Sequence, residues 1–111
     1  MGFKFIGPTQ LLKNGDMSGN LVSKAMDMLL MPFGAFEAIW TGTPTGTFSV
    51  DGSLDGVNWY PTGTPVNNPA GAADSTLINL AGVGFRYARL SYAKTGGVGS
   101  LTINGMAKGS S

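Results

Sequence analysis

The sequence of 111 residues contains neither cysteine nor histidine. Without cysteine it has no disulfide, thiolate metal site or thiol nucleophile, and without histidine it lacks the commonest general base and metal ligand. Most hydrolytic chemistry needs such groups, so we expect no enzymatic activity, no catalytic residues, and no cofactor or metal. The missing disulfides also argue against a small secreted domain, which usually needs these cross-links.

Charged residues are scarce as well. They make up 12% of the chain, about half of the ~25% that is typical of soluble domains. Seven basic and six acidic residues leave a net charge of +1, too little to attract nucleic acid, and we expect none as a partner. A free protein with so little charge tends to self-associate, whereas within an assembly much of the same surface is covered.

Long apolar runs are also missing. The longest near-candidate, residues 26–33, is far shorter than the ~20 residues that a membrane-spanning helix needs. It also carries Asp27 and contains Pro32. We therefore expect neither a signal peptide nor a membrane partner.

Glycine and strand-like patterns are abundant instead. The chain has 18 glycines, more than twice the usual share of ~7%. From residue 20 onward, strand signals recur about every ten residues, as in β-sandwiches and barrels. We expect strands near residues 20–26, 33–42, 46–52, 57–61, 76–80, 84–93 and 99–107. Within residues 21–30 a helix is an alternative, because Leu21, Ala25, Met28 and Leu29 could align on one face.

The predicted fold is therefore all-β: an antiparallel β-sandwich, jelly-roll-like, over residues 20–109. Residues 1–19 lack sustained periodicity and contain several glycines and a proline, so we expect an extended N-terminal arm there, either reaching a neighbour or fraying. Residues 110–111 form a short tail. The stretch 62–75 is rich in proline, glycine, alanine and asparagine and predicts a long loop.

Alternation within the strands predicts the core. Phe36 and Trp40 share one face of their strand, and Phe48 and Val50 share one face of the next. In the strand at 84–93 either face could point inward. We favour Ala88, Leu90 and Tyr92 inward, which leaves Arg89 outward with Tyr87 beside it.

Two turns carry strong sequence signals. Thr43-Pro44-Thr45-Gly46 suits a type I turn followed by a left-handed glycine, which predicts a hairpin with a glycine bulge. The glycine-rich turn at residues 95–99 predicts that the last two strands are adjacent and antiparallel.

The segment Asp51-x-Ser53-x-Asp55-Gly56 begins like the calcium loop of an EF-hand. The position that should supply the bidentate glutamate is Thr62, however, and no flanking helices are present. An Asp-Gly hairpin turn has the same local sequence and is the favoured interpretation. The pairs Glu37 with Asp27 and Asp51 with Asp55 have no spacing that supports acid/base catalysis.

Candidate contact residues come from three places. The N-terminal arm contributes Phe3 and Phe5. The methionine-rich segment contributes Met28 and Met31, which either fill the core or, if exposed, form an adaptable contact surface. Arg86 and Arg89 lie among tyrosines in the one basic and aromatic cluster, for which we favour a protein interface over nucleic acid.

Several of these segments together resemble small structural proteins of tailed bacteriophages. They are Gly-Ala-Phe-Glu-Ala-Ile-Trp-Thr-Gly at 34–42, Gly-Thr-Phe-Ser-Val at 46–50, Ser-x-Asp-Gly-x-Asn-Trp at 53–59, Phe-Arg-Tyr-Ala-Arg-Leu-Ser-Tyr at 85–92 and Gly-Val-Gly-Ser-Leu-Thr-Ile at 97–103. The resemblance spans about residues 18–109. The hairpin at 53–59 is also similar to one in discoidin-type, carbohydrate-binding jelly rolls.

The phage resemblance implies a capsid cement or decoration protein. Such a protein would be a small homo-oligomer, a dimer or trimer, on the capsid surface of the virion, with the major capsid protein as its partner. The alternative is a carbohydrate-binding module of the tail or capsid surface, which would recognise a bacterial glycan through Trp59, Tyr60 or Tyr87.

Overall fold

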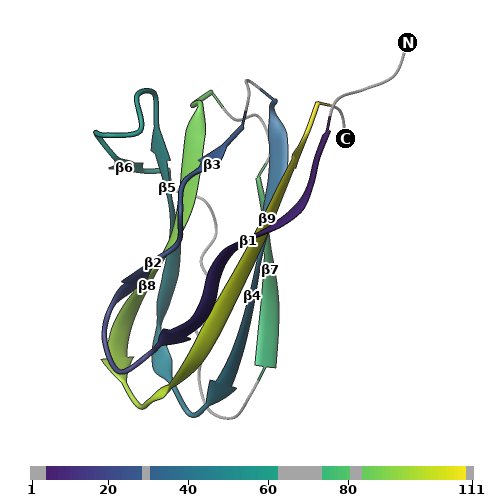
Figure 1. The fold of residues 1–111 in the computed structure, drawn as a ribbon. Coiled ribbons are helices and arrows are strands. Elements are labelled where there is room, and N and C mark those ends of the chain that lie inside the picture. Colours follow the sequence, from purple (N-terminus) through teal and green to yellow (C-terminus); the bar gives the residue numbers. More distant parts are fainter. Residues whose placement is uncertain (1–4, 29–30, 63–73, 81–83, 110–111) are drawn as a thin grey trace.

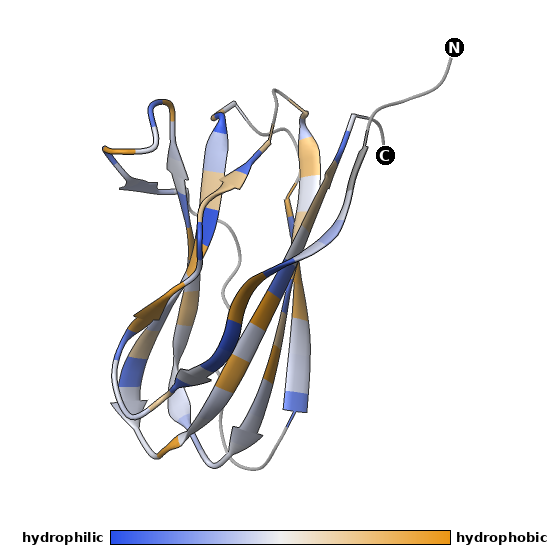
Figure 2. Ribbon diagram, in the orientation of Figure 1, coloured by the Kyte–Doolittle hydropathy of each residue, from blue (hydrophilic) through white to orange (hydrophobic). Residues whose placement is uncertain are grey.

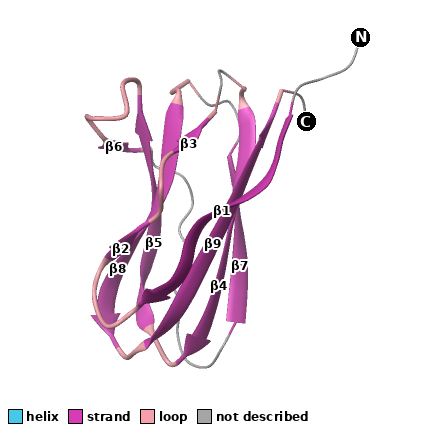
Figure 3. Cartoon of the chain, viewed as in Figure 1, coloured by secondary structure: helices cyan, strands magenta, loops and turns pink. Residues whose placement is uncertain are grey.

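The computed structural model describes residues 5–28, 31–62, 74–80 and 84–109. These residues form nine strands and no helix (Figure 3), and the strands make two antiparallel sheets that pack face to face (Figure 1). The all-β sandwich that the sequence predicts is therefore confirmed. Over the same residues, no helix has the length and apolar character needed to cross a bilayer.

The two sheets have the strand order of a jelly roll. One sheet contains, in order, β1 (Phe5–Asp16), β9 (Gly99–Lys108), β4 (Phe33–Gly42) and β7 (Asp74–Leu80). In the other, β2 (Leu21–Val22) and β3 (Met26–Asp27) both pair with β8 (Tyr87–Gly96), which is followed by β5 (Thr45–Ser53) and β6 (Tyr60–Pro61). With β2 and β3 taken as one interrupted strand, eight strand positions fill two four-stranded sheets, as in jelly rolls.

One antiparallel ladder runs through both sheets. β4 pairs with β9 as far as Gly42↔Gly99, and β5 pairs with β8 from Thr45↔Gly96 onward. Between these pairs the Thr43 amide donates to the Val98 carbonyl at 2.9 Å. Residues 33–53 and 87–108 therefore form one long paired ribbon, which bends from the first sheet into the second at the lower end of Figure 1. We call this bend, at residues 42–45 and 96–99, the corner.

Two predicted turns were wrong about which strands they join. Residues 43–46 and 95–99 were expected to join neighbouring strands of one sheet, but each connects strands of different sheets. Proline and glycine indicate a sharp bend, but they do not specify whether the next strand pairs with the previous one in the same sheet or enters the other sheet. At the corner the left-handed glycines are Gly42 (φ 88°) and Gly97 (φ 71°), in place of the predicted Gly46. The expected bulge does occur, as a register shift between Thr45 and Gly46.

The N-terminal segment also differs from the arm expected over residues 1–19. From Phe5 it forms the 12-residue edge strand β1, which pairs with β9. Leu11 in this strand and Met17 directly after it are buried, so the N-terminal segment contributes to the core. Three register shifts, the first beside Pro8, interrupt the alternation of its side chains. Those interruptions explain why no strand period is visible in the sequence.

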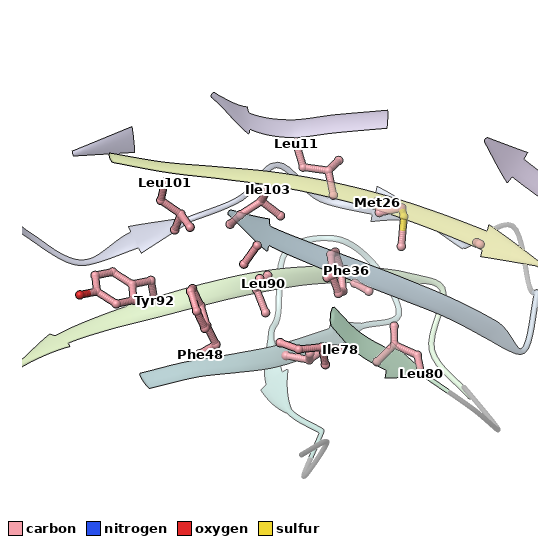
Figure 4. Close-up of a cluster of buried hydrophobic side chains, with 14 of the residues drawn as sticks. Leu11, Met26, Phe36, Phe48, Ile78, Leu80, Leu90, Tyr92, Leu101 and Ile103 are labelled. Atoms are coloured by element: carbon pink, nitrogen blue, oxygen red, sulfur yellow. The ribbon is translucent and has the colours of Figure 1, made fainter. Parts of the chain in front are cut away.

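Buried apolar side chains from both sheets fill the space between them (Figure 4). The predicted core residues are confirmed: Phe36, Trp40, Phe48, Val50, Ala88, Leu90 and Tyr92 are all at most 5% exposed. The Phe48 ring centroid lies 5.8 Å from that of Trp40 and 5.5 Å from that of Tyr92, so aromatic contacts join the sheets near the corner. Figure 2 shows the alternating apolar and polar positions along the strands.

The strand boundaries agree with the prediction to different degrees, and the strand expected at 84–93 lies three residues later, at β8. The strand at 33–42 is predicted to the residue, and that at 99–107 ends one residue early. The strand expected at 20–26 is split into β2 and β3, and the helix considered at 21–30 does not occur in the described part of that segment. The strand expected at 57–61 is reduced to the two residues of β6, because residues 54–59 form a loop.

Replacing Gly97 with alanine tests the corner. An added Cβ would lie 2.0 Å from the Thr43 carbonyl oxygen, so the paired backbones would have to separate. We expect Gly97→Ala to lower Tm by ~10 °C or more, as for a backbone substitution that costs ~2 kcal/mol. Thermal unfolding followed by circular dichroism measures the shift. In the control Gly19→Ala, a Cβ meets nothing within 4 Å, and Tm should not fall. A Gly97→Ala protein as stable as wild type would contradict this corner geometry.

Candidate functional site

The end of the sandwich opposite the corner carries a projecting loop. It joins β5 to β6 and stands out from the body of the sandwich in Figure 1. We call residues 53–60 the tip loop. The loop and the adjoining outer face of β5 and β8 form the candidate functional site.

Asp55 determines the shape of the tip loop. Its Oδ1 accepts hydrogen bonds from the backbone amides of Val57 at 2.8 Å and Asn58 at 2.9 Å, and its Oδ2 accepts one from the Asn58 side chain at 2.9 Å. Ser53, which is buried, donates its hydroxyl to Asp55 Oδ1 at 3.0 Å and accepts the Gly56 amide at 2.8 Å. The Asp-Gly turn predicted from the sequence is confirmed, with Gly56 in the left-handed region at φ 78°.

These donors stabilise the ionised form of Asp55. The backbone amides of Asn58 and Val57, followed by the side chains of Asn58 and Ser53, hold the pKa of the Asp55 carboxyl well below its usual range. The carboxylate is therefore charged at any ordinary pH. The charge is part of the loop's structure, because the same bonds fix the path of the backbone.

The tip loop presents large apolar side chains to solvent. Leu54 is 75% exposed, Val57 77% and Tyr60 65%. The described residues include seven exposed large hydrophobic side chains, and these three fall within seven consecutive positions. Such clustering differs from the single, scattered apolar residues that are normal on protein surfaces.

Trp59 connects the loop to the outer face of the second sheet. The Arg89 guanidinium lies 4.3 Å from the Trp59 ring centroid, within cation–π range. Arg89 Nε also donates to Asp51 Oδ2 at 3.2 Å, and the Ser91 hydroxyl donates to the same oxygen at 2.8 Å. The half-buried Arg89 is therefore held between an aromatic ring and a carboxylate.

Arg86, which directly precedes β8, is held in a comparable way. Its Nε and a terminal nitrogen donate to the two oxygens of Asp27 at 3.2 and 3.1 Å, and the guanidinium lies 5.2 Å from the Tyr87 ring centroid. The hydrogen bonds and charge of Asp27 raise the pKa of Arg86. Both arginines thus have their charge matched within the chain, and together they do not form a net positive patch.

The other predicted contact residues are either buried or outside the described part of the chain. Met28 and Met31 are 0% and 4% exposed, so they fill the core and their proposed role as a contact surface is corrected. Phe3 lies outside the described residues, as do the Phe5 side chain and most of the loop expected at 62–75. Of the six, only Arg86 and Arg89 are seen on the surface near the candidate site.

The acidic residues of the calcium-like pattern do not converge on one site. Asp51 accepts hydrogen bonds from Arg89 and Ser91, and Asp55 accepts hydrogen bonds from residues of its own loop. Within the described ranges, no group of three or more acidic, histidine or cysteine residues is placed to hold a metal ion. Thr62, at the position of the missing glutamate, donates its hydroxyl to the Val50 carbonyl at 3.0 Å.

Of the exposed apolar residues of the tip loop, Tyr60 was named for the carbohydrate-binding alternative, whereas Leu54 and Val57 were not predicted as functional. Polar residues are usual in tight turns. The apolar Leu54 and Val57 on either side of Asp55-Gly56 were therefore the sequence signal that could have indicated a contact site. The structure also shows a shallow groove of about 190 Å³ on the outer face of the first sheet. Its lining includes Pro8, Ala35, Leu77 and Met106, none of which the sequence had indicated.

Comparisons with known proteins give a structural match alone. No model of a protein family matches the sequence, and no curated protein matches it. The fold is similar to the crystal structure of SPBc2 prophage-derived protein YomS, with a TM-score of 0.63 and 6% sequence identity. The alignment covers 97% of this chain and 96% of that chain, so the likeness extends over the whole fold.

The Asp55 carboxyl should titrate below the ordinary aspartate pKa of about 3.9. Because its pKa is lowered in the folded protein, its stabilising effect is complete above the ordinary value and is lost as the pH falls through the lowered one. We therefore expect the loop to keep its structure at pH 4. An NMR pH titration of the Val57 and Asn58 amides measures the midpoint.

Asn58→Ala serves as the matched variant for that titration. It removes one side-chain donor to Asp55 and leaves the backbone donors in place. The midpoint, which is the pKa of the Asp55 carboxyl, should therefore rise part of the way toward the ordinary aspartate value. A wild-type midpoint at or above the ordinary aspartate value would contradict the hydrogen-bond network.

Proposed function

We propose that this protein is a phage virion structural protein, a cement or decoration protein that binds and stabilises the major capsid shell. The observation that carries the proposal is the similarity of the whole fold to a prophage-derived protein. The phage-like segments at 34–42, 46–50, 53–59, 85–92 and 97–103 support it independently.

The proposed mechanism is interface burial repeated by symmetry. A small homo-oligomer on the capsid surface would bridge neighbouring capsid subunits through several identical contacts. Contacts that are weak individually then combine into strong overall binding. A rigid jelly roll suits this role, because its two sheets share one core and one continuous ladder.

The surface chemistry agrees with a protein partner. Charged residues are few, and the two arginines near the candidate site are paired with Asp27 and Asp51. The tip loop adds exposed apolar area at one end of the molecule. Such a surface fits burial against protein better than binding to a polyanion.

The second candidate is a carbohydrate-binding module of the capsid surface or tail. The observation that favours it is the row formed by Trp59, Arg89, Asp51 and Ser91 on the outer face of the second sheet, with exposed Tyr60 nearby in the chain. Aromatic rings that can stack on a sugar, next to charged and hydroxyl groups, are a common composition for a glycan site.

Reconstitution tests the cement function. Purified protein is mixed with capsids that lack it, and co-sedimentation and the temperature of capsid disruption are measured. We expect the protein to pellet with the capsids and the disruption temperature to rise, because binding to the intact shell stabilises it. Protein that stays in the supernatant, with capsid stability unchanged, would show that the cement proposal is wrong.

Titration with host polysaccharide separates the two candidates. A saturable, sugar-specific signal that is lost in Trp59→Ala but kept in Tyr87→Phe would favour glycan recognition. The cement proposal predicts no such signal for either variant or for wild type.

A further inference from the structure

The tip loop is built to hold apolar side chains outside the core. Its backbone amides at Val57 and Asn58 are satisfied by Asp55, and the amide of Gly56 is satisfied by the buried Ser53 hydroxyl. The loop therefore keeps its shape without burying Leu54 or Val57. A loop whose conformation is already fixed loses little entropy when it binds, which favours affinity.

The base of the loop is also fixed. The ring of Phe85 lies directly over Gly52, where an added Cβ would be 2.7 Å from ring atoms. Trp59 rests against Arg89, which is anchored by Asp51. Contacts on both sides of the tip thus hold Leu54 and Val57 in a defined position away from the sandwich.

We propose that the tip loop is a preformed anchor that inserts Leu54 and Val57 into an apolar pocket on another virion protein, with Tyr60 at the rim. This inference rests on the proposed function, and the capsid shell is the first partner to test. It assigns binding to three largely exposed side chains within a short stretch of the chain. The exposure of Leu54 and Val57, 75% and 77%, is the apolar area that this pocket would cover.

Charge favours protein over membrane as the partner. Asp55 is ionised at the tip and makes no ion pair among the described residues, while Arg86 and Arg89 are paired with other carboxylates. An anionic lipid surface would repel such a tip. A pocket with a neutral or basic rim would accept it.

The test compares two matched double variants. Leu54→Ser with Val57→Ser changes the tip. Leu77→Ser with Val98→Ser changes the same residue types at positions that are 59% and 60% exposed but lie outside the tip loop. All four residues are on the surface, so both variants should keep the wild-type Tm. Binding is measured on capsids that lack the protein, on purified tails, and on phosphatidylcholine and phosphatidylglycerol vesicles.

We expect the tip variant to bind its particle at least about ten-fold more weakly than wild type. The control variant should stay within about two-fold of wild type, as for surface changes away from an interface. Tip-dependent binding to tails but not to capsids would support the anchor and overturn the cement function.

Three results would overturn the anchor. The tip variant could bind its particle as tightly as wild type, which would leave the cement function standing. Wild type could bind vesicles in a tip-dependent way and bind no particle, which would assign the loop to lipid. Wild type could bind neither capsids nor tails, in which case the anchor and the cement function both fall.

Discussion

The close approach of two chain segments at the corner is the constraint on which the rest of this structure depends. A Cβ added at Gly97 would lie 2.0 Å from the Thr43 carbonyl oxygen, and one added at Gly99 would lie 2.1 Å from that of Thr41. Only glycine permits backbones this near. The contact lets the ladder continue from β4 and β9 into β5 and β8, with one register shift between Thr45 and Gly46, so the pairing in one sheet is linked to the pairing in the other.

That register sets up the candidate site at the other end. It places Asp51 opposite Arg89 and Ser53 opposite Tyr87, so the carboxylate that holds Arg89 and the hydroxyl that supports Asp55 come from the last residues of β5. A slip of one residue would turn these side chains to the other face of the sheet. The exposed tip loop is therefore linked to the corner through the length of β5 and β8.

The sequence allowed the core to be predicted because burial in a sandwich repeats every second residue, as Phe36 and Trp40 show. It did not allow the pairing of consecutive strands to be predicted, because a bend with proline and glycine looks the same whether strands re-pair or change sheets. The sequence predicted an arm in place of the long strand β1, because three register shifts, the first beside Pro8, break the alternation of its side chains. The exposed position of Leu54 and Val57 depends on how Asp55 folds its own loop, and apolar residues at a turn give no period to detect.

In the proposed function, this jelly roll would attach to the phage capsid by the end of the sandwich that lies opposite the corner. Electron cryomicroscopy of the mature virion tests this most directly. We expect density for this sandwich on the outside of the shell, with residues 53–60 at the contact with the major capsid protein. A virion without such density on the capsid, or a sandwich attached by its corner, would contradict it.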